Sequence, residues 1–179
     1  GQQQGQEQQQ SLVKHLSPQG VGNVLLSLGT LAASDAQLAA AVDRQLAQQL
    51  LQHAVDLAQA AGGGFETDFT PQSAANVLFG AALLGLQPER GQLQALLAPV
   101  QAAVSSLTSK GVTQLLLAFQ RFSVRAQGLR GQQSRADVVS KLHPYHLYYP
   151  GDALLAAVLE HACQLNRRRC LGVQAAGQA

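Results

Sequence analysis

Basic side chains recur every four to six residues in the C-terminal half of the chain, in a stretch otherwise rich in Gln, Gly and Ser. Cations spaced in this way can contact the phosphates of a nucleic acid, which gives affinity that falls with salt and does not depend on base sequence. The alternative is a solvated loop that keeps the protein soluble. The residues predicted to contact phosphate are Arg121, Arg125, Arg130, Arg135 and Lys141.

A second basic group, Arg167, Arg168 and Arg169, ends a helical pattern near the C-terminus. These side chains are also predicted to contact phosphate, and the alternative is that they only complement the helix dipole. The net charge of the chain is +2, but residues 1–108 carry a net −4 and residues 109–179 a net +6. A polyanion would therefore meet the C-terminal half first.

Two histidines and the two cysteines are the residues that could bind a metal: His143, His146, Cys163 and Cys170. Their His-x-x-His and Cys-x6-Cys spacings match no standard structural zinc site. Two cysteines seven residues apart on one helix lie about 10 Å apart along its axis, which is too far for a disulfide. We expect no metal and a reducing compartment, with Cys163 buried and His143 in a packing role.

Three tyrosines lie close together in HPYHLYYPGD, at positions 145, 148 and 149. They could stack on single-stranded bases, or they could fill a packing seam. An enzyme is not expected, because the chain has no Gly-rich phosphate loop before a helix and no nucleophile, base and acid set with supporting context. No cofactor is expected either.

The composition predicts the elements that must position these residues. Apolar residues make up 46% of the chain and charged residues 12%, and Ala, Leu and Gln, all good helix formers, are its commonest residues. No apolar run reaches the roughly 18 residues of a membrane helix, so membrane insertion is not expected. Residues 1–11 are Gln-rich, and this composition predicts a linker.

An internal repeat organises the helices. The segment TPQSAANVLFGAALLGL, at 70–86, aligns without gaps on SPQGVGNVLLSLGTLAA, at 17–33, and more weakly on TSKGVTQLLLAFQRFSV, at 108–124. The starts are 53 and 38 residues apart, so the first unit has the length of the second plus a 15-residue insertion. Each copy opens with Ser or Thr, a favoured N-cap, and in two copies Pro follows at the first helical position.

Within each copy, apolar residues recur at intervals of three and four, as on a helix with a buried face. Leu26, Phe79 and Leu117 widen this stripe, so these helices are expected to be buried on more than one side. Asn23 and Asn76 are expected to form hydrogen bonds between repeats.

Second helices are expected after each first helix. Ser34 is predicted to cap one that runs to about Ala61, and Pro88 is predicted to open another that runs to Leu107, with a kink or break at Pro99. After Val124 a basic loop is expected. Helical spacing resumes at 150–166, which would complete the third unit.

The predicted fold is all-α, an α-solenoid of helix-turn-helix repeats with about three 38-residue units, one of which has an insertion. The expected divisions are a Gln-rich linker at 1–11, repeat 1 with its insertion at 12–69, repeat 2 at 70–107, repeat 3 with the basic loop at 108–170, and a tail at 171–179.

With these motifs the chain resembles the octatricopeptide-repeat family of green-algal organellar proteins. Residues 70–88 match best: Asn76 stands at the Asn position of that family, Phe79 where Trp is common, and Gly85 and Pro88 at its Gly and Pro. The first copy has Asn23 but Leu26 at the aromatic position, and the third copy has neither. FAST-kinase-like helical arrays share a similar pattern.

The resemblance implies an organellar RNA-binding protein that acts in RNA maturation, stability or translation, such as an rRNA-binding component of a mitochondrial ribosome. The implied compartment is the mitochondrial matrix, or else the chloroplast stroma. The alternative function is a scaffold that docks neighbouring protein subunits of a large complex and makes no contact with RNA.

Overall fold

Every regular element that the structure describes is a helix, which confirms the all-α prediction. The computed structural model describes residues 12–61, 69–130 and 150–176, with the backbone alone for 124–130 and 169–176. The helices are α2 Pro18–Ser34, α3 Ala36–Ala41, α4 Arg44–Ala61, α5 Pro71–Leu84, α6 Arg90–Ala102, the 3₁₀ helix η1 Val104–Ser106, α7 Ser109–Arg130 and α9 Asp152–Ala176.

The three predicted helix starts are confirmed. In each one a Ser or Thr hydroxyl accepts a hydrogen bond from the backbone N–H three residues further on, at 3.1 Å. Such a cap satisfies one of the N–H groups that a helix start leaves without a partner. The three caps are Ser17 before α2, Thr70 before α5 and Thr108 before α7.

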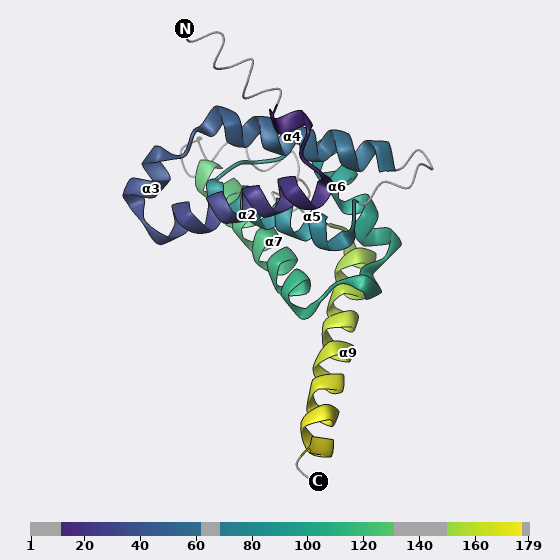
Figure 1. Ribbon diagram of the computed structural model, residues 1–179. Helices are drawn as coiled ribbons and strands as arrows, with labels where there is room; N and C mark the ends of the chain where they lie inside the picture. The colour runs from purple at the N-terminus through teal and green to yellow at the C-terminus, as the bar shows by residue number, and fades with distance from the viewer. Residues whose placement is uncertain (1–11, 62–68, 131–149, 177–179) are drawn as a thin grey trace, which may run out of the picture.

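The helices form two rows (Figure 1). In the first row, α5 packs between α2 and α7. In the second row, α4 packs against α6, and α9 packs against α7 and η1, as expected for the second helix of the third unit. The first row therefore contains the first helix of each repeat unit. Whether this stacking is that of an α-solenoid stays a prediction.

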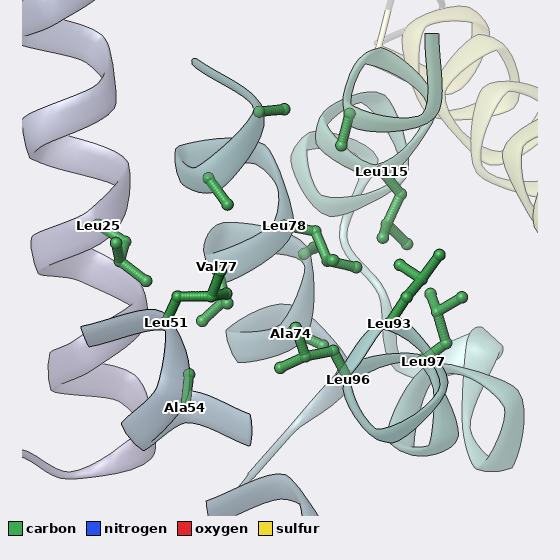
Figure 2. Close-up of a cluster of buried hydrophobic side chains, with 14 of the residues drawn as sticks. Leu25, Leu51, Ala54, Ala74, Val77, Leu78, Leu93, Leu96, Leu97 and Leu115 are labelled. Atoms are coloured by element: carbon green, nitrogen blue, oxygen red, sulfur yellow. The ribbon is translucent and has the colours of Figure 1, made fainter. Parts of the chain in front are cut away.

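The core lies between the rows, where side chains from five helices meet (Figure 2). Leu25 comes from α2, Leu51 from α4, Val77 and Leu78 from α5, Leu96 from α6 and Leu115 from α7. Helix α5 is buried on several sides, which explains why its segment carries no charged residue. None of the helices in the described ranges combines the length and hydropathy that a bilayer span needs.

Helices α2 and α5 approach each other closely because glycines line their contact. A β-carbon on Gly29 would lie 2.8 Å from the Gly80 carbonyl oxygen, and one on Gly80 would lie 2.5 Å from the Leu25 carbonyl carbon. Real β-carbons do not come so near. Any larger residue at these positions would push the two helices apart.

The prediction of one helix from Ser34 to Ala61 is wrong, because two aspartates divide the segment. Ser34 is the last residue of α2, the Asp35 carboxylate caps α3, and the Asp43 carboxylate caps α4 by accepting from two backbone N–H groups. Helix α3 has no buried residue. Leu38 of this helix is 43% exposed.

The second unit also differs from its prediction at both ends of its second helix. Helix α6 begins at Arg90, two residues after Pro88, and the side-chain oxygen of Gln92 accepts from the Glu89 N–H at 2.9 Å. The helix continues across Pro99 and ends at Ala102, and η1 follows. Pro99 lies in the last turn of α6 and removes one backbone N–H donor there. The helix continues for three more residues before it ends.

The prediction of a loop directly after Val124 is wrong for residues 125–130, since α7 continues to Arg130. Residues 125–130 read RAQGLR, and Arg, Ala, Gln and Leu are all good helix formers. The single Gly128 costs about 1 kcal/mol in a helix, which its neighbours offset. Residues 125–130 are thus helical, and the rest of the predicted loop, with Arg135 and Lys141, lies outside the described residues.

Candidate functional site

A shallow groove crosses the first row of helices and is open to solvent. It has a volume of about 430 Å³. One apolar side chain from each first-row helix lines it: Leu26 from α2, Phe79 from α5 and Leu117 from α7. We call it the first-row groove, and its remaining lining residues are Thr30, Ser109, Lys110, Thr113 and Gln114.

The three apolar residues of the first-row groove are equivalent in the repeat. Each stands nine residues after its cap, so three helices with the same start and the same direction of packing present them on the same side. They were predicted to widen the buried stripe. That prediction is wrong for Leu117, which is 38% exposed, and Leu26 and Phe79 are only half-buried.

A chain of side-chain hydrogen bonds links the three first-row helices. Asn76 donates to the Asn23 side-chain oxygen at 3.2 Å, which confirms the expected bond between repeats. The Gln72 amide donates to the side-chain oxygens of Asn76, at 3.3 Å, and of Gln114, at 3.1 Å. Its own oxygen accepts from the Thr108 hydroxyl at 2.7 Å.

This chain of bonds holds the groove in register. Asn23, Asn76 and Gln114 each stand six residues after their caps; Asn76 bonds to Asn23 directly, and Gln72 links Asn76 to Gln114. Gln114 is buried and its side-chain oxygen accepts the hydrogen bond from Gln72, and the residue also lines the first-row groove. The amide network therefore reaches the wall of the groove.

Charge is divided between the two rows. The three first-row helices contain no Asp or Glu, and their charged residues are all basic and all in α7. The carboxylates of the described ranges lie in the second row or in its connections. They belong to Asp35, Asp43, Asp56, Glu89, Asp152 and Glu160.

Two of these basic residues share one face of α7. Lys110 and Arg121 are both exposed, and at 100° per residue their eleven-residue separation leaves them about 20° apart around the axis and about 16 Å apart along it. Leu117 of the first-row groove lies between them on the same face. The groove is therefore flanked by positive charge along α7.

The structure does not gather the predicted phosphate contacts into one cluster. Arg121 is exposed on α7, and Arg125 and Arg130 stand in its last two turns, where the backbone alone is described. Arg167 and Arg168 are exposed on α9, and Arg169 follows them on the same helix. Arg135 and Lys141 lie outside the described residues.

The C-terminal ends of α7 and α9 point to opposite sides of the molecule (Figure 1). The group at Arg167–Arg169 is therefore separate from the group on α7. Sequence reasoning missed Lys110 and the groove itself. The absence of carboxylates from all three first helices was the signal that could have found them.

The other candidates give no site in the described ranges. Cys163, expected to be buried, is exposed on α9, and no group of three or more potential metal ligands occurs among the residues that the structure describes. The residues His143 and His146 and the tyrosines at 145, 148 and 149 lie outside those ranges.

Compared with known proteins, the chain matches no family model, no curated protein and no solved structure. The resemblance to octatricopeptide repeats thus depends only on the residues of this sequence that carry it.

Proposed function

We propose that this chain is an RNA-binding helical-repeat protein that contacts RNA with the first-row groove and the α7 face beside it. The observation that carries this proposal is the separation of charge: the row that forms the groove has basic residues and no carboxylate. A polyanion is attracted to such a surface, whereas in the second row carboxylates offset the arginines.

The groove residues suit the parts of a nucleotide. Lys110 and Arg121 can each neutralise a phosphate, and the spacing between them leaves room for the groove. Phe79 is half-buried, so part of its ring is open to stack with a base. The hydroxyl of the exposed Thr113 lines the same groove and can form hydrogen bonds with base edges.

The resemblance to organellar repeat proteins supports the rest of the proposal. On that ground the chain acts in an organelle, in RNA maturation, stability or translation. The specific form that we propose is an rRNA-binding component of a mitochondrial ribosome in the matrix. The chloroplast stroma is the alternative compartment.

A salt titration of binding to a single-stranded oligouridylate tests the proposal. For single strands, log K falls with log salt with a slope of about −0.7 for each phosphate neutralised. The double variant Lys110→Gln with Arg121→Gln should bind more weakly, and its slope should be shallower by about 0.7 for each phosphate that it no longer neutralises.

The matched control is Arg44→Gln with Arg90→Gln, which removes two exposed positive charges from the second row. This control should keep the affinity and the slope of the unchanged chain. Two results would contradict the proposal. One is an affinity of the unchanged chain that does not depend on salt, and the other is a control that loses as much affinity as the α7 variant.

A second function, a scaffold for neighbouring subunits without RNA contact, is favoured by the apolar residues that α2 exposes. Val24 is 36% exposed and Leu31 is 50% exposed. In this case the chain would capture protein subunits from an organellar extract treated with nuclease, and the double variant in α7 would capture them equally well.

A further inference from the structure

Helix α2 has the composition of a buried helix but stands at the edge of its row. It contains no charged residue in its seventeen positions, and the same is true of α5, which is buried on several sides. A helix that faces solvent usually has charged or strongly polar residues on that side. Instead, α2 exposes Val24 and Leu31, which lie seven residues apart on one side of the helix.

The alignment of the repeat shows that this exposed side of α2 corresponds to the side of α5 that faces α2. In α5, Ser73 and Gly80 face α2: a β-carbon on Gly22 would lie 3.2 Å from the Ser73 carbonyl oxygen, and one on Gly29 would lie 2.8 Å from that of Gly80. The equivalent residues of α2, three and ten positions after its cap, are Gly20 and Ser27. Both pairs are small residues seven apart.

The two exposed aliphatic residues follow the same correspondence. Val24 is equivalent to Val77 and Leu31 to Leu84. Gly20, Val24, Ser27 and Leu31 follow one another at intervals of four, three and four, which is one stripe of a helix. This stripe lies about 200° around α2 from Gly22 and Gly29, the glycines that face α5.

The stripe continues an interface that the molecule already has. Helix α2 docks on α5 through glycines that fit against small residues, and the outer side of α2 repeats the small residues of α5 in the same order. We propose that the stripe Gly20, Val24, Ser27, Leu31 docks one further α-helix of the same kind as α2, the first helix of another repeat unit. That helix is uncharged and has two small residues seven positions apart.

A second folded copy of this chain does not supply that helix: its α7 has Thr113 and Gln120 at the equivalent positions and carries charge, and its α2 is already in use. The Gly22 and Gly29 side of α2, which would have to face the stripe, is already packed on α5 in every copy. The partner must therefore come from a further unit whose first helix still has that side free. This inference does not depend on RNA binding, since the stripe faces away from α5 and contains no charge.

A tandem chain tests the proposal. Residues 12–69 are placed directly before residues 17–179, so that an added first unit leads into Ser17 through the connection that normally leads into Thr70. Because neighbouring repeats stabilise one another, the tandem should unfold in a single transition with a higher midpoint than the original chain. The amides of the added α2 and α4 should be protected from hydrogen exchange.

The substitution Ser27→Arg provides both the test and its control, because the tandem contains Ser27 twice. In the inner copy, which belongs to residues 17–179, the arginine lies in the new interface. The amides of the added unit should then exchange as those of an unfolded segment, and the unfolding midpoint should return to that of the original chain. In the outer copy the same arginine faces solvent and should change neither result. The proposal is overturned if the unsubstituted tandem leaves its added unit unprotected, or if both positions of the arginine have the same effect.

Discussion

His53 and His161 make the same hydrogen bond in two different repeat units. The Nε2 atom of His53 lies 3.0 Å from the carbonyl oxygen of Leu16, and that of His161 lies 2.9 Å from the carbonyl oxygen of Leu107. Each leucine directly precedes an N-cap residue, and each histidine comes from a second-row helix. A carbonyl oxygen can only accept a hydrogen bond, so Nε2 carries the proton in both histidines. The shared bond also shows that α9 has the same place in the third unit as α4 has in the first.

The two histidines should differ in what they contribute to stability. His161→Leu leaves the buried Leu107 carbonyl without this partner, which costs about 1–3 kcal/mol. His53 is only partly buried, so water can replace its side chain, and His53→Leu should cost less. Urea unfolding of both variants measures the difference, with the exposed His15→Leu as the control. Equal losses at 53 and 161 would show that burial does not govern this bond.

Gly80→Ala should destabilise the fold, although alanine favours helices. The added β-carbon would lie 2.5 Å from the Leu25 carbonyl carbon, which belongs to backbone and cannot move aside cheaply. Overpacking of this kind costs about 1–3 kcal/mol, and we expect a thermal midpoint lower by about 2–4 °C for each kcal/mol.

Gly91→Ala is the matched change for Gly80→Ala. Gly91 is exposed in α6, and a β-carbon there would have no atom within 4 Å. The substitution should therefore raise stability by about 0.5–1 kcal/mol, the usual gain for Gly to Ala in a helix. A Gly80→Ala variant as stable as Gly91→Ala would contradict the close approach of α2 and α5.

Removal of Gln72 alone should cost more than removal of Gln72 together with Gln114. In Gln72→Leu the buried Gln114 oxygen loses its donor, and an unsatisfied buried polar group costs about 1–3 kcal/mol. In the double variant with Gln114→Leu both partners of this bond are replaced by apolar side chains. A double-mutant cycle by urea unfolding measures the coupling, and strictly additive losses would mean that the bond contributes nothing.

Phe79→Leu should weaken binding of single-stranded RNA without unfolding the protein. Leucine keeps the side of the first-row groove apolar, as Leu26 and Leu117 do, but removes the aromatic face. Stacking contributes about 1–3 kcal/mol for each base, so the dissociation constant should rise between about 5-fold and 150-fold. A dissociation constant within about twofold of that of the unchanged chain would exclude stacking on Phe79, while the salt slope would still report on Lys110 and Arg121.

The two basic groups should act independently. Since the C-terminal end of α9 lies away from that of α7, losses of affinity for a long RNA from Arg121→Gln and Arg168→Gln should add to within about 0.5 kcal/mol. An oligonucleotide too short to reach from the groove to the end of α9 should respond to Arg121→Gln alone. Equal responses of the short oligonucleotide to both changes would place the two groups in one site.

The features of the fold that could be predicted from the sequence are those with local causes. The caps at Ser17, Thr70 and Thr108 depend on residues within one turn, so the predicted starts of the first-row helices were correct. The asparagine bond was also predictable, because the repeat places Asn23 and Asn76 at the same position of neighbouring helices.

The features that were missed depend on competition or on neighbours. Ser34, Asp35 and Asp43 could each cap a helix, and only the folded chain shows that both aspartates do. Likewise, an apolar side chain beside a buried stripe can face a neighbouring helix or an open groove. Periodicity does not distinguish these two cases, so Phe79 was assigned to the core.

The separation of charge between the two rows acts before any contact is made. The charged residues of the first row are all basic, whereas carboxylates offset the arginines of the second row, so the protein has an electric dipole moment across its rows, and a polyanion that diffuses toward it is turned to meet the groove first. Such steering raises the rate of association more than the lifetime of the complex. The carboxylates of the second row thus contribute to orientation although none of them lies in the groove.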